Sequence, residues 1–310
     1  MKNTPIFIAG HRGLAGSAIL RNLQSRGYTN LITRTHAELD LTQAADVNAF
    51  FEQTRPKIVI LAAAKVGGIK ANSTWPADFI LQNISIQTAV INAALQYDVE
   101  RFLFLGSSCI YPRECPQPIK EEYLLTSALE PTNEPYAIAK IAGLKMCEAI
   151  QKQYGKRYLA VMPTNLYGPG DNYNLVTSHV IPAILRKIHQ AKIDQAPTVE
   201  LWGTGAPRRE FLYIDDMADA CMHLLLNTNA NELTNIGTGT DITIKELAHL
   251  IAKTVDYKGQ IVFDHIHPDG TPQKLLDISK LKSYGWTPKT SLEDGLKHTY
   301  QDFLNGNFRE

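Results

Sequence analysis

Cysteine is scarce in this sequence, and neither sign of charge is in excess. Four of the 310 residues are cysteine, and they form no CxxC pair and no metal-ligand spacing. This usage argues against a disulfide framework and is typical of a reducing compartment. Lysine plus arginine equals aspartate plus glutamate, at 31 each, so the formal net charge is zero. Proteins that bind nucleic acid or anionic membranes generally carry a basic excess, so we expect neither partner.

Long apolar runs are missing as well. No run approaches the roughly 20 residues that span a bilayer, and the apolar part of the first stretch, MKNTPIFIAGHRG, is too short for a secretory signal. Apolar residues nevertheless make up 44% of the chain, which is enough for one large domain or two modest ones. We expect a cytoplasmic protein without a metal site.

Short apolar runs alternate with helix-like segments from Pro5 to about Tyr167. The runs are nearly continuous and rich in Val, Ile, Leu and Phe, which is typical of strands buried on both faces of a parallel sheet. They read IFIAG, NLIT, KIVILAAA, RFLFLGSS and YLAVMPTN. Amphipathic stretches such as SAILRNLQSRG lie between them. This alternation predicts an α/β fold with a doubly wound, Rossmann-like parallel sheet.

The pattern changes after Pro169, where polar loops and shorter elements follow. We expect residues 1–170 to form the Rossmann-like domain and residues 171–310 to form mainly a smaller C-terminal substrate-binding lobe. Part of the second region should return to the main sheet, so the boundary is not sharp. The helices expected in this region span about 179–190, 244–255 and 292–304.

A glycine-rich turn follows the first strand. GHRGLAG places Gly10, Gly13 and Gly16 in a GxxGxxG spacing between a strand and a helix. Glycine lets the backbone turn tightly and approach a pyrophosphate, and the helix N-terminus supplies free N–H groups. The spacing alone is a weak signal. Its position at the start of an α/β chain favours a dinucleotide site over a glycine turn without a ligand.

The end of the second strand distinguishes NADP from NAD. An NAD site usually has Asp or Glu there, hydrogen-bonded to the ribose hydroxyl. This strand runs instead into Arg34 and His36, and Arg12 adds a cation from the glycine turn. Guanidinium groups suit a 2′-phosphate. The sequence therefore favours NADP, with Asp40 and Leu41 near the adenine.

Serine, tyrosine and lysine occur where a dehydrogenase needs them. The fourth strand ends in LGSSCIYP, and the carboxyl ends of such strands face the ligand crevice, so Ser107 and Ser108 should face the cofactor. Tyr136 and Lys140 follow on one face of a predicted helix. The lysine should lower the pKa of the phenol from about 10, so that the tyrosine exchanges a proton while hydride moves. Serine can polarise the same oxygen, and lysine can hold the nicotinamide ribose. The alternative is a packed tyrosine beside a surface lysine.

Two further residues could carry acid-base chemistry. Cys109 lies in the same loop as Ser107, and a thiol can act as a base when a cation is near. His179 opens the first helix of the second lobe, in TSHVIP, and could act from the opposite side. Spacing alone leaves other interpretations open: a small buried thiol and a histidine that only starts a helix.

The chain as a whole resembles the extended short-chain dehydrogenase/reductases that act on nucleotide sugars, and more closely the GDP-L-fucose synthases. The matching stretches cover nearly the full length, and together they are highly specific. They are GHRGLAGSAI, AAAKVGGI, LGSSCIYP, LEPTNEPYAIAKIAG, MPTNLYGP, SHVIPA, REFLYIDDMA and PDGTPQKLLD.

This resemblance implies a two-stage reaction on GDP-4-keto-6-deoxy-D-mannose. The 4-ketone acidifies the protons on C3 and C5. A base removes each proton, and an acid returns one to the opposite face. NADPH then reduces the ketone to give GDP-L-fucose. By this resemblance Ser107, Tyr136 and Lys140 carry the reduction, while Cys109 and His179 carry the epimerisations.

The resemblance also implies two sets of binding residues. The cofactor set is Gly10, His11, Arg12, Gly13, Leu14, Ala15, Gly16, Arg34, His36, Asp40, Leu41, Leu105, Gly106, Ser107, Ser108, Lys140, Pro163, Thr164, Asn165, Leu166 and His179. Within it, Pro163–Leu166 would line the nicotinamide. The substrate set is Lys187, Trp202, Arg209 and Asp277. Structural alternatives for these four include a solvated helix lysine, a core tryptophan, and an aspartate that caps the helix before ISKL.

The chain departs from the family pattern at His36. A basic residue often occupies this position, two residues after Arg34, and histidine is a weaker phosphate ligand at neutral pH. The preference for NADP is therefore expected to be less strict.

Other enzymes and a non-enzyme remain as alternatives. A nucleotide-sugar 4,6-dehydratase usually needs Thr-Asp-Glu after the fourth strand, where this chain has Ser107, Ser108 and Cys109. A simple 4-epimerase or 4-reductase would not need Cys109 and His179. A non-catalytic NADP-binding sensor would bind NADP without consuming it.

The resemblance further implies an assembly. The helix expected over Pro76–Val99 and the helix that carries Tyr136 would pack against the same helices of a second copy as a four-helix bundle, which predicts a homodimer. Cys115 receives no role.

Overall fold

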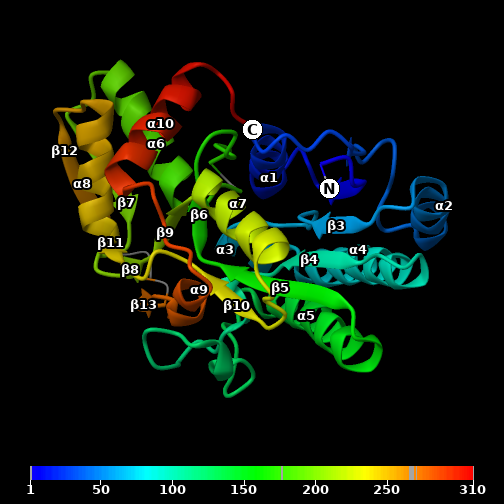
Figure 1. The fold of residues 1–310 in the computed structure, drawn as a ribbon. Coiled ribbons are helices and arrows are strands. Elements are labelled where there is room, and N and C mark those ends of the chain that lie inside the picture. The colour runs from blue at the N-terminus through cyan, green and yellow to red at the C-terminus, as the bar shows by residue number, and fades with distance from the viewer. Residues whose placement is uncertain (1, 176, 265–268, 270, 310) are drawn as a thin grey trace.

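A six-stranded parallel sheet forms the centre of the fold (Figure 1). A computed structural model describes residues 2–175, 177–264, 269 and 271–309. The strands lie in the order β10-β5-β4-β3-β1-β2, and each neighbouring pair runs parallel. Their bounds are Ile6–Ala9 (β1), Leu31–Ile32 (β2), Ile58–Leu61 (β3), Arg101–Leu105 (β4), Arg157–Pro163 (β5) and Thr234–Ile236 (β10).

Helices cover both faces of this sheet. Figure 1 shows α1 and α7 on one side and α4 and α5 on the other. Every residue of β1 and β3 is buried, because a central strand is covered whichever way its side chains point. The doubly wound α/β fold predicted from the sequence is confirmed. The helices around this sheet are Leu14–Ser25 (α1), Ala44–Thr54 (α2), Ile69–Thr74 (α3), Pro76–Gln96 (α4), Glu134–Tyr154 (α5) and Ile214–Met222 (α7).

A smaller group of strands and helices has its own hydrophobic cluster. Its strands pair as β7 with β12, and as β11-β8-β13. Helices α6, α8 and α10 pack beside them (Figure 1). The bounds are Val180–Ile193 (α6), Thr198–Trp202 (β7), Arg208–Arg209 (β8), Ile242–Thr243 (β11), Ile244–Val255 (α8), Gln260–Asp264 (β12), Gln273–Lys274 (β13), Ser279–Ser283 (α9) and Leu292–Leu304 (α10).

The two groups exchange elements. Strand β10 comes from the second half of the chain and pairs with β5 in the main sheet. Strand β6 (Asn165–Tyr167) pairs with β9 (Phe211–Tyr213), just where β5 ends. Strand β10 and helix α7 both come after residue 170 and lie with the main sheet. The division of the chain near residue 170 remains a prediction.

Helix α8 shows how the local sequence sets an element. The Thr243 hydroxyl accepts the backbone N–H of Glu246 at 3.1 Å, and the Glu246 carboxylate accepts that of Thr243 at 2.9 Å. This reciprocal cap satisfies two N–H groups that a helix start leaves unpaired. Buried residues then recur at helical spacing, at Leu247, Ile251 and Val255. The expected helix over 244–255 is thus confirmed.

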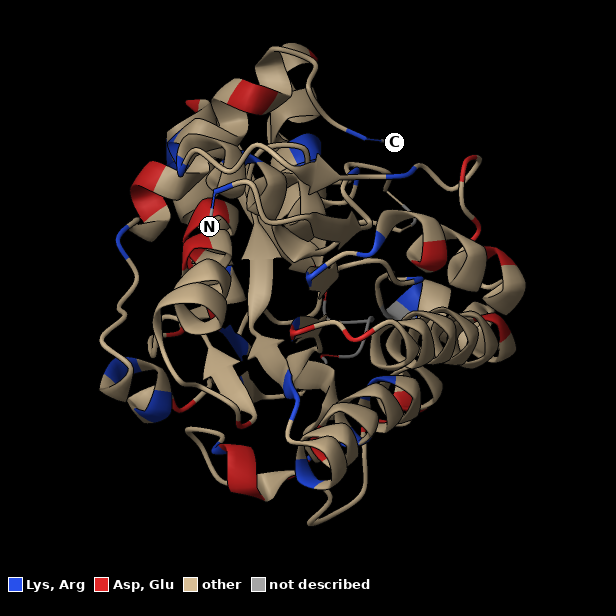
Figure 2. Cartoon of the chain, turned by 45° about the vertical axis from the view of Figure 1, so that its right-hand side comes forward, with Lys and Arg blue, Asp and Glu red and all other residues tan. Residues whose placement is uncertain are grey.

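The surface carries both signs of charge. Lys and Arg positions are interspersed with Asp and Glu positions along the chain (Figure 2). None of the described helices is long and apolar enough to cross a membrane. Of the stretch PDGTPQKLLD, Pro268 and Gly270 lie outside the described residues.

Candidate active site

The turn between β1 and α1 leaves no room for a side chain at Gly10 or at Gly16. Gly10 has a φ of +89°, and a Cβ there would lie 2.6 Å from the backbone nitrogen of Ala63. A Cβ on Gly16 would lie 2.2 Å from the carbonyl oxygen of Gly10. Helix α1 begins after Gly13 without a side-chain cap. Its first N–H groups therefore lie at the end of β1, where a pyrophosphate can approach the backbone.

Two arginines and a glutamate meet at the end of β2. The Arg34 guanidinium lies 5.3 Å from the ring centre of Phe50. The Glu38 carboxylate accepts the backbone N–H of Thr35 at 2.7 Å. This bond lowers the pKa of Glu38, with smaller contributions from Arg34 and Arg12. Glu38 was not among the residues predicted to bind cofactor, yet it lies among the cations expected to hold the 2′-phosphate.

His36 and Asp40 continue the same edge. The His36 side chain is 84% exposed, and its Nδ1 lies 3.8 Å from Oδ1 of Asp40. Asp40 also accepts the backbone N–H of Thr42 at 2.9 Å, which holds the pKa of that carboxyl below its usual range. Burial, helped by the charge of Arg12, lowers the pKa of His11 in the glycine turn. The other predicted cofactor residues of this region pack, partly buried, against the main core: Leu14, Ala15 and Leu41.

Lys140 is buried between α5 and β4. Its Nζ donates to the carbonyl oxygen of Leu105 at 2.8 Å and lies 5.0 Å from the ring centre of Phe104. Burial lowers the pKa of Lys140 to about 8. A Cβ on the next strand-end residue, Gly106, would lie 2.0 Å from Cε of Met162, so the backbone packs closely here. Lys140 therefore joins the helix to the strand end rather than reaching solvent.

Tyr136 is buried in a small cluster with Ala71 and Phe79, against which Cys109 packs. The Phe79 ring lies edge-on at 6.2 Å between ring centres. Burial, with a smaller contribution from Cys109, raises the pKa of Tyr136, and a side-chain hydrogen bond with Ser107 opposes this shift. Tyr136 is packed, but because Lys140 is buried as well, the alternative of a packed tyrosine beside a surface lysine is wrong.

The predicted effect of Lys140 on the phenol is wrong. Lys140 was expected to lower the pKa of Tyr136, whereas burial raises it. The lysine Nζ lies 5.9 Å from the centre of the tyrosine ring and is hydrogen-bonded to Leu105. The phenol thus keeps its proton near neutral pH and can act as a proton donor.

Ser107 and Cys109 are held in one turn after β4. The Ser107 hydroxyl oxygen accepts the backbone N–H of Cys109 at 3.3 Å. Cys109 is half-buried, while Ser108 between them is buried. Burial lowers the pKa of Arg209, and interactions with Asp269 and, to a smaller extent, with Cys109 oppose this shift. A cation thus lies near the thiol, as a thiolate base requires.

His179 caps the N-terminus of α6. The residue is exposed to solvent, yet neighbouring protein desolvates the ring enough to lower the pKa of His179. The preceding loop touches the start of α3, where the backbone nitrogen of Gly68 donates to the carbonyl oxygen of Thr177 at 3.4 Å. Ala71 of the same short helix belongs to the Tyr136 cluster. Helix α3 therefore connects the neighbourhood of Tyr136 and Cys109 to that of His179.

The four predicted substrate residues divide into two pairs. The Lys187 Nζ lies 5.2 Å from the ring centre of Trp202, whose side chain is 61% exposed. The interpretation of Trp202 as a core anchor is therefore wrong. Arg209 is partly buried and donates from Nη1 to the Arg208 carbonyl oxygen at 2.7 Å. Asp277 accepts the backbone N–H of Ser279 at 2.8 Å, but the interpretation of Asp277 as a helix N-cap is wrong, because Ile278 is the N-cap of α9.

The segment after β5 is attached to a residue that was not predicted. Thr164 Oγ1 and Asn165 Nδ2 both donate to the backbone carbonyl oxygen of Glu210, at 3.2 and 2.9 Å. Glu210 is fully buried. A glutamate directly before the apolar run FLYI could have drawn attention to it, because an acid that such a run buries needs a full set of partners.

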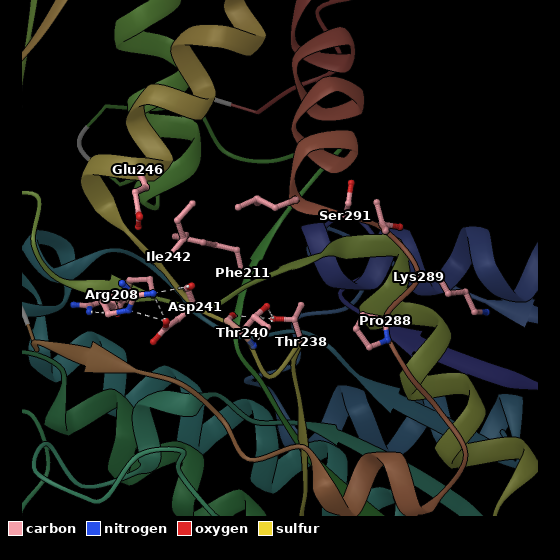
Figure 3. Close-up of a pocket in the computed structure, with 13 residues that line it drawn as sticks. Arg208, Phe211, Thr238, Thr240, Asp241, Ile242, Glu246, Pro288, Lys289 and Ser291 are labelled. Carbon is pink, nitrogen blue, oxygen red and sulfur yellow. Dashed lines mark hydrogen bonds and ion pairs between the residues drawn. The ribbon is translucent and has the colours of Figure 1, made fainter.

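A cavity of about 580 Å³ lies beside β8. Figure 3 shows Arg208 and Asp241 joined across one side, Thr238 and Thr240 in the middle, and Pro288–Ser291 opposite. Arg208 donates from Nε to Oδ1 of Asp241 at 2.7 Å. Arg209 lines this cavity, but Ser107, Cys109, Tyr136 and His179 do not. The residues predicted to carry the reaction therefore lie outside the lining of this cavity.

Known proteins that resemble this chain do so over nearly its full length. The sequence model of the NAD dependent epimerase/dehydratase family matches residues 6–237. GDP-L-fucose synthase 1 of Arabidopsis thaliana is 58% identical over 303 residues, with 98% of this chain and 94% of that protein covered. GDP-L-fucose synthase of Escherichia coli K12 is 54% identical, covering 100% and 99%. A GDP-L-fucose synthetase of Naegleria fowleri bound to NADP superposes with a TM-score of 0.91 at 27% identity, covering 99% of this chain and 94% of that one.

Proposed function

This chain belongs to the GDP-L-fucose synthases of the NAD dependent epimerase/dehydratase family, and on that premise we propose that it converts GDP-4-keto-6-deoxy-D-mannose to GDP-L-fucose. It is an NADPH-dependent epimerase and reductase. One observation carries the proposal from the site itself. Ser107, Cys109 and Tyr136 gather at the carboxyl end of β4, and a simple reductase would not need the thiol.

The glycine turn and the cations at the end of β2 fit NADP. Side chains at Gly10 and Gly16 would collide with neighbouring backbone, so glycine there lets the turn close tightly before α1, where a pyrophosphate can approach the backbone N–H groups. Arg12 and Arg34 would hold the 2′-phosphate. Lys140 would hold the nicotinamide ribose, and Pro163–Leu166 would line the ring. When bound, NADPH supplies the hydride that reduces C4.

The epimerisations come first in this mechanism. Tyr136 and Ser107 donate hydrogen bonds to the 4-carbonyl oxygen and stabilise the enolate that forms. Cys109, which lies near Arg209, would act as the base that removes the proton from C3 or C5. His179 returns a proton to the opposite face of the same carbon. Desolvation by neighbouring protein lowers the pKa of His179, and an imidazolium of lowered pKa is a stronger acid.

The reduction uses the same oxygen. As hydride reaches C4, negative charge develops on the 4-oxygen, and Tyr136 transfers its phenolic proton there. Because burial keeps that phenol protonated near neutral pH, the donor is ready before the hydride arrives. Ser107 holds the oxygen by its hydroxyl. One pair of residues therefore serves both stages.

The substrate nucleotide would lie on the side of the second lobe. Lys187 and Arg209 are cations suited to the diphosphate, and Trp202 offers an exposed flat ring. Asp277 is assigned to this set only by family resemblance, since its carboxylate already binds Ser279.

We also propose that the chain forms a homodimer in the cytoplasm. Helices α4 and α5 pack against each other, and their outer sides expose Leu81 at 65% and Ile138 at 43%. Apolar residues at such exposure on neighbouring helices suit a four-helix bundle with a second copy. Four free thiols suit a reducing compartment.

The decisive assay follows the absorbance of NADPH, with NADH in parallel, after addition of GDP-4-keto-6-deoxy-D-mannose. NADPH oxidation with GDP-L-fucose as the identified product is expected. Reduction to an unepimerised sugar would leave only the reductase. Cofactor binding without turnover would support the sensor alternative.

A further inference from the structure

Glu210 lies between β8 and β9 and is 0% exposed. It follows Arg209 directly, and Arg209 is the cation proposed to meet both the substrate and Cys109. A carboxylate at such depth is costly for folding unless hydrogen bonds compensate it, so its partners show what it is there to hold.

The carboxylate binds two segments that are distant in sequence. Oε1 accepts the backbone N–H groups of Thr238 and Gly239, at 2.6 and 2.7 Å. Oε2 accepts the backbone N–H of Leu276 at 2.9 Å. The approach is close, because a Cβ on Gly237 would lie 2.3 Å from Oε1. The loop after β10, which lines the cavity of Figure 3 at Thr238, is thereby fixed to the β8–β9 connection.

The backbone of the same residue binds the cofactor side. Its carbonyl oxygen accepts Thr164 Oγ1 and Asn165 Nδ2, in the segment proposed to line the nicotinamide. Glu210 thus joins three parts of the site. Its main chain holds the nicotinamide segment, and its side chain holds the loop after β10 and the residue before Asp277.

We propose that Glu210 is a positioning residue for the GDP-sugar: its buried carboxylate fixes Arg209 and the Leu276–Asp277 segment at a set distance from the Thr164–Asn165 segment. The inference rests on the proposed function and adds a residue to it. Arg209 can address a diphosphate only if β8 holds its backbone still, because guanidinium–phosphate bonds depend on orientation.

The test replaces Glu210 by glutamine. An amide keeps the size of the side chain, but its NH₂ group must face either Leu276 or the Thr238–Gly239 pair, donor against donor. Loss of a hydrogen bond to a charged group corresponds to about 10- to 100-fold in a binding constant. We expect the KM for GDP-4-keto-6-deoxy-D-mannose and the Kd of GDP to rise by that factor. The Kd of NADPH should change by less than about twofold, because the carbonyl oxygen of Glu210 is retained.

The matched control is Asp216→Asn. Asp216 is also buried and accepts two backbone N–H groups, from Lys289 and Thr290, at 2.8 and 2.7 Å. It touches none of the substrate or cofactor segments through these bonds. It should lower the melting temperature without changing the Kd of GDP. Gly237→Ala would disturb the packing of the loop after β10 against the Glu210 carboxylate, because the new Cβ would lie 2.3 Å from Oε1. This variant replaces Glu210→Gln if Glu210→Gln does not fold.

The outcomes separate the two proposals. A folded Glu210→Gln protein that binds GDP and the sugar as the wild type does would overturn the positioning role. Equal losses of GDP and NADPH affinity would also overturn it, since they indicate a general structural role. If the wild-type protein itself neither bound GDP nor formed GDP-L-fucose, the proposed function would fail first.

Discussion

The ammonium group of Lys140 donates a 2.8 Å hydrogen bond to the carbonyl oxygen of Leu105. This contact joins α5 to the end of β4, so the helix that carries Tyr136 is fixed relative to the turn that carries Ser107 and Cys109. A carbonyl oxygen does not neutralise the ammonium charge, and burial lowers the pKa of Lys140 to about 8. The contact therefore shapes the site, and the burial of Lys140 makes the stability of the fold depend on pH.

Lys140→Met should change that dependence. Below about pH 8, Lys140 is charged in the folded and the unfolded chain, and its burial opposes folding by about 3 kcal/mol. As the pH rises towards 10.5, the folded chain releases the proton first and the cost falls. From about pH 7.5 to 9.5, wild type should gain about 2 kcal/mol in free energy of unfolding relative to the variant. Urea denaturation at several pH values measures this difference, and parallel pH profiles would contradict it.

Tyr136→Phe should lower the rate of NADPH oxidation by about 10² to 10⁴, because the proton donor to the 4-oxygen is lost. The Kd of NADPH should stay unchanged. Single-turnover kinetics and fluorescence titration measure the two quantities. Tyr158→Phe is a matched control, since Tyr158 is buried in the core and its hydroxyl has no hydrogen-bond partner in the described structure. Full activity of Tyr136→Phe would remove it from the reaction.

Cys109→Ser and His179→Gln should stop the epimerisations and spare NADPH binding. Each removes one acid-base group, so the rate of GDP-L-fucose formation should fall by about 10² or more. Deuterium wash-in at C3 and C5, followed with oxidised cofactor, reports this stage without the reduction. Cys115→Ser, another half-buried cysteine without an assigned role, should exchange at the wild-type rate. Undiminished exchange in Cys109→Ser would refute its role as the base.

His36→Arg should sharpen the preference for NADPH over NADH. The His36 side chain is 84% exposed in the segment that follows β2, so an arginine has room there to reach a 2′-phosphate. An added charge-assisted hydrogen bond corresponds to about tenfold in the ratio of the two kcat/KM values. Steady-state kinetics with both cofactors gives that ratio. An unchanged ratio would show that Arg12 and Arg34 alone set the preference.

Leu81→Arg should weaken the proposed dimer. The Leu81 side chain is 65% exposed on α4, and an arginine there would place a charge inside the expected four-helix bundle. Light scattering at micromolar concentration should show a monomer–dimer mixture or a monomer. Ile193→Arg, on the exposed end of α6 at 62%, is the matched control and should remain dimeric. A monomeric wild-type protein would overturn the assembly.

Local sequence was sufficient for many elements of this fold, although α6 runs on to Ile193, past the expected end at 190, and α4 ends at Gln96 instead of Val99. Buried strands such as β1 and β3 are written as continuous apolar runs, since helices cover both faces of a parallel sheet. Helices α8 and α10 begin and end at the predicted residues, because apolar spacing and the caps at Thr243 and Ser291 mark them within the chain. The glycine turn could also be predicted from local sequence, since the φ of +89° at Gly10 favours glycine.

What the sequence by itself determined is therefore the fold class and the candidate chemical groups, because both depend on residues close together along the chain. Tertiary structure alone decided their environment. Burial reversed the expected shift in the pKa of Tyr136 and drew Lys140 to Leu105. Arg209 came near Cys109 across a hundred residues of sequence, and Glu210 gathered N–H groups from two distant segments. Desolvation and hydrogen bonding act through space, and no spacing along the chain records which groups they will bring together.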